Sequence, residues 1–127
     1  RHYKEKYGVE VPASRVVVTT GSSAAFLLSF TALFDAGDRV ALASAGYPCY
    51  RNILNALGCE VATVPVNRDF KLTAAELEEA MRSDEAAGKP AIRGVILSSP
   101  SNPTGAMLTP QELEGLATFC ERRGVVF

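Results

Sequence analysis

The sequence predicts an α/β protein, a three-layer sandwich in which a mostly parallel sheet lies between two layers of helices. Two observations carry this prediction. Short apolar or β-branched runs alternate with longer segments of helical character along the 127 residues. The short runs are apolar nearly throughout, as in strands that are covered on both faces of a parallel sheet.

The first third of the chain is expected to contain two strands. A short helical stretch opens the sequence, and Val16 to Thr20 forms a β-branched run of strand length. Gly21 then permits a tight corner. Residues 24–34 are apolar nearly all round, which predicts a buried helix. The apolar run Arg39 to Ala43 predicts the second strand.

The middle of the chain repeats this alternation. A corner at Gly46-Tyr47-Pro48 begins a helix that leads to the third strand, residues 60–66. Thr73 and Glu76 have the spacing of a capping box, in which each residue satisfies free groups at the start of a helix. We expect that helix to end in the loop formed by residues 83–90.

The last third contains the fourth strand, residues 92–97, and another capping box. Thr109 and Glu112 have the capping spacing, and Pro110 stands at the first helical position, where its missing N–H costs nothing. We expect this helix to end at Gly124 and a fifth strand to begin there.

Composition narrows the class of protein. Hydrophobic residues make up 47% and charged residues 21%, which is typical of a globular domain. A net charge of -1 gives no support to a nucleic-acid or membrane partner. The three cysteines lack the paired spacing of a zinc site, so we interpret them as reduced residues of a cytoplasmic protein with no metal. The chain opens without methionine and closes within a predicted strand, so we expect residues 1–127 to be part of a larger domain, truncated at both ends.

The Thr19-to-Ala25 segment has the pattern of an anion site. Ser22 and Ser23 follow a predicted strand and a glycine, where free backbone N–H groups and the helix dipole favour a phosphate or a carboxylate. Neither a Walker lysine nor a G-x-G-x-x-G motif is present. Taken locally, the alternative that a serine only caps the helix is favoured, because serine is a common cap.

Two further polar elements follow later strands. Tyr47, restrained by Pro48, offers a flat face to a planar ring, whereas Tyr50 is expected to be a packing residue. Asn102 lies between two prolines, and its amide can both donate and accept hydrogen bonds; the alternative is an ordinary turn. The carboxyl ends of parallel strands are where such folds bind ligands. Together the three elements indicate a planar, phosphorylated ligand, pyridoxal 5'-phosphate.

The chain resembles the class I/II, fold-type I pyridoxal-phosphate-dependent aminotransferases, and specifically part of their large domain, over almost its whole length. The segments that carry the resemblance are T-T-G-S-S-A-A, L-F-D-A-G-D, A-G-Y-P-C-Y and S-N-P-T-G. The resemblance implies that the amides of Ser22 and Ser23 hold the cofactor phosphate and that Tyr47 stacks on its ring. It also implies that Asn102 binds the 3-oxygen of the ring, with a cis peptide bond before Pro103.

The catalytic groups of that family are missing from this sequence. The lysine that anchors the cofactor, usually in an S-x-S-K context, is absent, as are the aspartate and arginine that contact the ring and the substrate. Hence no catalytic residue is assigned. The lysines are expected to be solvated: Lys4, Lys6, Lys71 and Lys89. Solvation is also expected for an acidic helix face around Glu76 and Asp84, and Arg51 is expected in a surface ion pair or at a partner subunit.

The resemblance implies a cytoplasmic, homodimeric biosynthetic enzyme that transfers an amino group between an amino acid and a 2-oxo acid, with no nucleic-acid or membrane partner. This chain alone is expected to be inactive. Two other classes stay open: an aminotransferase-like domain of a transcriptional regulator, and a module that binds phosphate ligands without chemistry. Within the enzymes, a β-lyase or a synthase of the same family also stays open.

Overall fold

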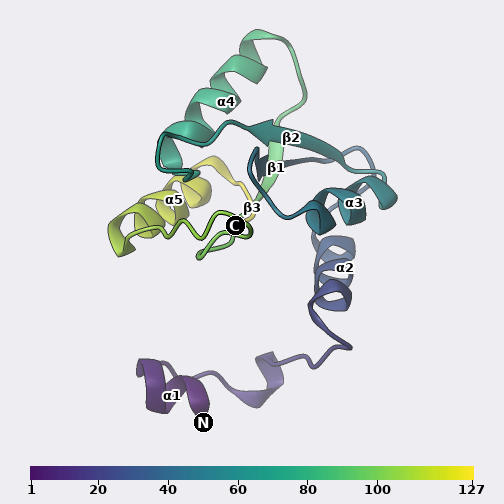
Figure 1. Cartoon of the computed structure of the whole chain (residues 1–127). Coiled ribbons are helices and arrows are strands. Elements are labelled where there is room, and N and C mark those ends of the chain that lie inside the picture. The colour runs from purple at the N-terminus through teal and green to yellow at the C-terminus, as the bar shows by residue number, and fades with distance from the viewer.

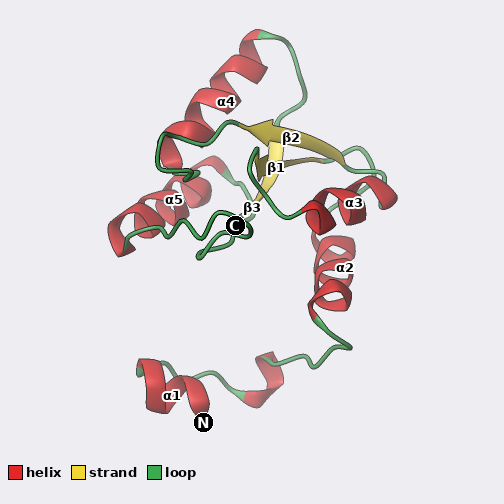
Figure 2. Ribbon diagram, viewed as in Figure 1, coloured by secondary structure: helices red, strands yellow, loops and turns green.

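A computed structural model describes all residues, 1–127, and its centre is a sheet of three parallel strands (Figures 1 and 2). These are β1 (Arg39–Ala43), β2 (Glu60–Val64) and β3 (Ile92–Ile96), in the order β2-β1-β3. Val126 adds one parallel bridge to Gly94 of β3. The predicted parallel sheet and three of its strands are therefore confirmed, with β2 and β3 slightly shorter at their carboxyl ends than the predicted residues 60–66 and 92–97.

Helices cover both faces of the sheet, which makes three layers (Figure 2). On one face lie α2 (Ser22–Leu33) and α3 (Pro48–Ala56). On the other lie α4 (Ala74–Ala86) and α5 (Pro110–Arg123). The remaining helix, α1 (His2–Tyr7), is followed by a single 3₁₀ turn, Ala13–Arg15, and both stand away from the sheet (Figure 1).

The alternation of side chains along β1 explains why the sheet has two cores. Val40 and Leu42 point to one face and pack with Phe30 of α2 and Leu54 of α3. Ala41 points to the other face, into a cluster that the strands share with α4 and α5. Successive side chains of a strand face opposite sides, so a strand buried on both faces must be apolar at every position.

Both predicted capping boxes are present. The amide of Thr73 donates to Glu76 Oε2 over 2.9 Å, and that of Thr109 donates to Glu112 Oε2 over 2.7 Å. The two threonine hydroxyls accept from amides of the first helical turn in return. These contacts fix the starts of α4 and α5.

The structure corrects three expectations, two about strands at the edges of the sheet and one about the burial of a helix. Residues 16–20 form no strand, and Val18 is 92% exposed. The expected fifth strand is reduced to the bridge at Val126. A strand exists only through hydrogen bonds to a neighbour, and the β-branched run has none here. The expected burial of residues 24–34 is also wrong, because Phe30 is the one buried residue of α2.

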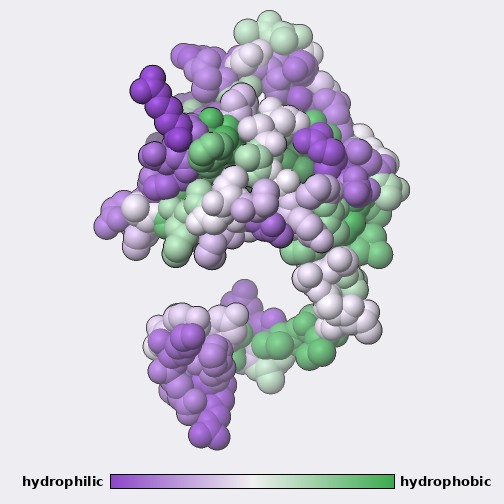
Figure 3. All heavy atoms as spheres, viewed as in Figure 1, coloured by the Kyte–Doolittle hydropathy of each residue, from purple (hydrophilic) through white to green (hydrophobic).

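Figure 3 shows where hydrophilic and apolar side chains gather on the surface. Hydrophilic side chains cover the opening helix, while apolar groups are exposed where the chain crosses from it toward α2. The exposed apolar residues of this crossing and of α2 include Val16, Val17, Val18, Leu27 and Leu28. None of the helices combines the length and the apolar composition that crossing a bilayer requires.

Candidate functional site

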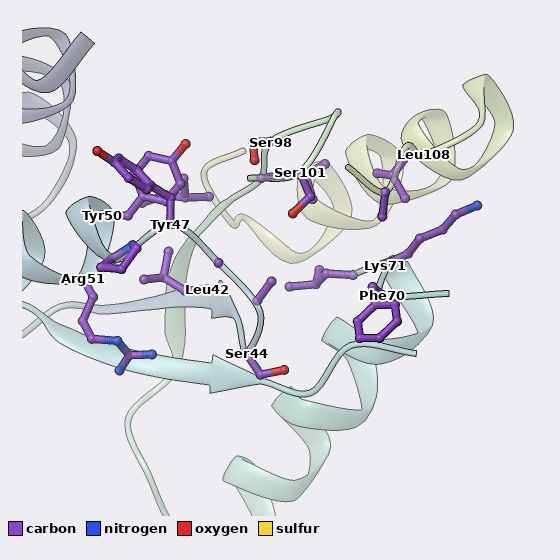
Figure 4. A pocket seen from close by; sticks show the side chains of 17 residues that line it. Leu42, Ser44, Tyr47, Tyr50, Arg51, Phe70, Lys71, Ser98, Ser101 and Leu108 are labelled. Atoms are coloured by element: carbon purple, nitrogen blue, oxygen red, sulfur yellow. The ribbon is translucent and has the colours of Figure 1, made fainter. Parts of the chain in front are cut away.

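The candidate site lies where the strands end. Because β1 and β3 are parallel neighbours, the loops that follow them emerge at the same edge of the sheet. Between these loops is a cavity of about 140 Å³. Figure 4 shows Tyr47 and Tyr50 on one side of it, Ser98 and Ser101 above, and Phe70, Lys71 and Leu108 at the far side.

Tyr47 occupies the junction between β1 and α3. It is the N-cap residue of α3, with extended backbone angles (φ -70°, ψ 125°), and Pro48 takes the first helical position. Proline there disfavours a helical conformation for the residue before it, so the chain turns at Tyr47. The side chain is 41% exposed. The sequence therefore folds locally in a way that leaves an aromatic ring partly free at the strand ends.

The start of α2 bears on the two readings of Ser22 and Ser23. Gly21 is the N-cap, with φ 93°, and no side chain caps the helix. The first hydrogen bond runs from the Ala25 amide to the Gly21 carbonyl over 3.3 Å. The amides of Ser22 and Ser23 precede it and have no carbonyl of the helix to bind. The alternative that a serine side chain caps the helix is thus wrong, and the free amides at the start of α2 can donate hydrogen bonds to an anion.

Asn102 lies in the loop between β3 and α5. The loop is held by its own contacts, since the Ser101 amide donates to the Ala106 carbonyl over 2.8 Å and Gly105 donates to Ser101 over 2.7 Å. The peptide bonds before Pro100 and Pro103 are both cis, so the one expected at Asn102 is confirmed. Asn102 itself is exposed.

The predicted site residues differ in whether they share a hollow with Tyr47. Ser23 and Tyr47 line one shallow groove together with Cys49, whose Sγ lies 3.6 Å from Ser23 Oγ. Ser101, the neighbour of Asn102, lines the cavity of Figure 4 with Tyr47. Asn102 lines neither of these hollows. Tyr47 thus contributes to both hollows, whereas Ser23 and the Asn102 loop each border one of them.

The structure places two cationic residues at the cavity, Lys71, which was expected to be solvated, and Arg51, which was expected in a surface ion pair or at a partner subunit. Lys71 is only 18% exposed, and its Nζ lies 3.0 Å from Glu112 Oε2. A hydrogen bond from the Thr109 amide, followed by those from Lys71, lowers the pKa of Glu112. Arg51 donates to Thr63 Oγ1 over 3.0 Å instead of forming an ion pair. No local pattern marks Lys71, because its partner is 41 residues away.

Two further expectations about charged and sulfur-containing residues can be compared with the structure. Asp84 is 16% exposed and pairs with Arg39, so it is not simply solvated. Cys49, Cys59 and Cys120 are all free thiols.

Comparison with known proteins supplies the family. The family model for aminotransferase class I and II matches residues 1–127. A valine–pyruvate aminotransferase of Mycobacterium tuberculosis is 50% identical over 97% of this chain and 30% of its own length. A probable N-acetyl-LL-diaminopimelate aminotransferase of Bacillus subtilis is 34% identical over 88% of this chain and 27% of its own length. The chain thus spans less than a third of these relatives.

Solved structures agree with this match. The crystal structure of an aminotransferase from Mycobacterium tuberculosis superposes with a TM-score of 0.87 and 50% identity, over 97% of this chain and 30% of that one. The aspartate aminotransferase of Rhizobium meliloti superposes with a TM-score of 0.83 and 25% identity, over 98% and 30%. With the family model matching from end to end, the chain belongs to the class I and II aminotransferases.

Proposed function

We propose that the full-length protein binds pyridoxal 5'-phosphate and transfers an amino group between an amino acid and a 2-oxo acid. The observation that carries the proposal is the uncapped start of α2 beside Tyr47. A phosphorylated planar ring suits this pair, because the amides favour the phosphate and the tyrosine favours the ring. Residues 1–127 would form part of the cofactor-binding large domain.

The part of the site that fits this cofactor is the start of α2 beside Tyr47, where Ser23 and the tyrosine border one groove. The amides of Ser22 and Ser23 would bind the phosphate, Tyr47 would stack on the ring, and Asn102 would donate to the ring 3-oxygen. The small residues Gly21 and Ala24 leave the backbone accessible to the ligand. When bound, the cofactor supplies an electron sink for the charge that develops on the substrate α-carbon.

The proton carrier and covalent anchor are proposed to lie outside these 127 residues. Lys71 is the lysine at the candidate site, and Glu112 holds its amine in an ion pair. Lys89 is paired with Asp84, which Arg39 also contacts. Neither has an amine free for the cofactor, so the chain acts by binding and orienting it.

The names of the relatives suggest which substrates to test first. The relative at 50% identity is named for valine and pyruvate, which makes that pair the first to test. The names of the relatives compared are those of aminotransferases and give no support to a regulator or a lyase. By the same resemblance, we propose a cytoplasmic homodimer.

The test uses the full-length protein, freed of cofactor and titrated with pyridoxal 5'-phosphate. We expect a visible absorption band that saturates, followed by repeated turnover of valine to its 2-oxo acid only when pyruvate is present to accept the amino group. A protein that gives the band without amino transfer would contradict the enzymatic proposal. Absence of any band would contradict cofactor binding itself. The 127-residue chain alone serves as the control and is expected to give no turnover.

A further inference from the structure

A row of aromatic rings runs from the candidate site along one face of the sheet, and we call it the aromatic row. Neighbouring ring centroids lie 5.7, 4.9, 5.9 and 6.3 Å apart. Its members, in order, are Tyr47, Tyr50, Phe26, Phe30 and Phe34. These spacings are those of rings in direct contact.

Tyr50 has a particular place in this row. It meets Tyr47 edge-on at 82° and Phe26 edge-on at 83°. Figure 4 shows the Tyr50 and Tyr47 side chains close together at the side of the cavity. Tyr50 is half-buried, whereas Tyr47 is 41% exposed. The exposed Tyr47 ring therefore packs against Tyr50, which is more buried and is itself in contact with Phe26.

The row also ties Tyr47 to the element that carries the free amides. Phe26 belongs to α2, whose first turn contains Ser22 and Ser23, and its ring packs against Tyr50 of α3. Phe30 is buried at 5% exposure in the core on this face. Tyr50 is thus the contact through which a ring at the start of α3 is fixed relative to α2.

We propose that Tyr50 is a positioning residue that sets the orientation of the Tyr47 ring toward the cofactor. The inference rests on the proposed function and assigns to Tyr50, which lines the cavity beside Tyr47, a role that it exerts through the Tyr47 ring. The edge-on neighbour restricts rotation of the Tyr47 ring on one side, which favours one orientation before a ligand arrives. Preorganisation of this kind raises affinity because less side-chain conformational entropy is lost when the ligand binds.

The proposal makes a specific claim about chemistry. Both contacts of Tyr50 are made by its ring, so phenylalanine keeps them and leucine does not. Tyr50→Leu is expected to raise the dissociation constant of pyridoxal 5'-phosphate about fivefold, the effect of losing one aromatic pair. Tyr50→Phe is expected to retain the wild-type affinity.

The experiment uses the full-length protein and titrates its visible absorption band with pyridoxal 5'-phosphate. Inorganic phosphate is measured in parallel as a competitor. Because phosphate has no ring, its inhibition constant is expected to be the same in wild type and Tyr50→Leu. The leucine change is also made in a Tyr47→Ala background, where it is expected to have no further effect on affinity.

A matched control separates orientation from stability. Phe119 is 4% exposed in the core on the opposite face of the sheet, so Phe119→Leu disturbs packing without touching the aromatic row. Its cofactor affinity is expected to be that of wild type. If Tyr50→Leu fails to fold, Phe26→Leu removes the support of Tyr50 from the other side and is expected to weaken cofactor binding in the same sense.

The outcomes are distinct. Equal cofactor affinity in wild type, Tyr50→Leu and Phe26→Leu would overturn the inference. The inference would also be overturned if Tyr50→Leu lowered cofactor affinity as much in the Tyr47→Ala background as in the wild type, because Tyr50 would then not act through Tyr47. A wild-type protein that binds no cofactor contradicts the proposed function instead, and is recognised before any variant is compared.

Discussion

Arg39 donates from Nε to Glu60 Oε1 over 2.8 Å, joining the first residues of neighbouring strands β1 and β2. The same guanidinium donates to the Pro90 carbonyl over 2.7 Å and lies 3.0 Å from Asp84 Oδ2. The Arg39 side chain is only 3% exposed. This network lies at the amino ends of the strands, opposite the candidate site, and ties β1 to β2, α4 and the loop before β3.

Replacing the buried cation should destabilise the fold. Arg39→Met leaves Asp84 with Lys89 alone and the Pro90 carbonyl without its donor. We expect a loss of about 2 to 3 kcal/mol, which is less than for a buried charge left without any partner, because Lys89 still pairs with Asp84 and the Glu60 side chain is half in water. The midpoint of urea unfolding measures this. Arg82→Met, at an exposed pair with Glu79, should cost less than about 0.5 kcal/mol; equal costs would contradict the role given to burial.

The pH dependence of this network follows from Asp84. Burial acts to raise the pKa of Asp84, but hydrogen bonds from Lys89 and Arg39 and their charges outweigh it, so the pKa is lowered. A lowered folded-state pKa contributes stability that is present above the unfolded value of about 3.9 and is lost as pH falls through the folded value. The stability gap between wild type and Asp84→Asn should therefore be constant near neutrality and narrow below about pH 4. A gap that widens with acid would show that the sign is wrong.

The close approach of helix and strand at Gly94 gives a packing prediction. A Cβ added at Gly94 would overlap the ring of Phe34, the residue that follows α2. Gly94→Ala should cost about 1 to 3 kcal/mol, the usual range for overpacking. Trimming the neighbour in Gly94→Ala/Phe34→Leu should recover part of this loss in thermal unfolding. Strict additivity of the two single changes would exclude the contact as the cause.

The proposed phosphate site can be tested by removing one backbone donor. Ser22 is the first residue of α2, a position where proline is tolerated, so Ser22→Pro deletes its amide N–H while keeping the helix. We expect the dissociation constant of pyridoxal 5'-phosphate to rise at least about tenfold, as for a lost hydrogen bond to a charged group. Ser22→Ala keeps the amide and should bind like wild type. If the alanine variant loses as much as proline, the hydroxyl is the ligand.

Much of the fold could be predicted from local sequence. The strands at residues 39–43 and 92–97 were identified because side chains buried on both faces must be apolar throughout. The starts of α4 and α5 were identified because a threonine and a glutamate three residues apart satisfy each other within one turn. Tyr47 could be placed at a strand end because Pro48 restrains it.

The remaining features depend on partners that are distant in sequence. Residues 16–20 have the composition of a strand, but a strand forms only when a neighbouring strand supplies hydrogen bonds. In this structure β3 forms its outer bridge with Val126 and not with residues 16–20. Lys71 and Asp84 look like ordinary surface charges until Glu112 and Arg39 are brought beside them. Sequence alone determined the alternation of elements from β1 onward, the two capping boxes and the resemblance, because these depend on neighbours along the chain. The tertiary structure decided which charges are buried and which rings meet, because those energies arise between residues that only folding brings together.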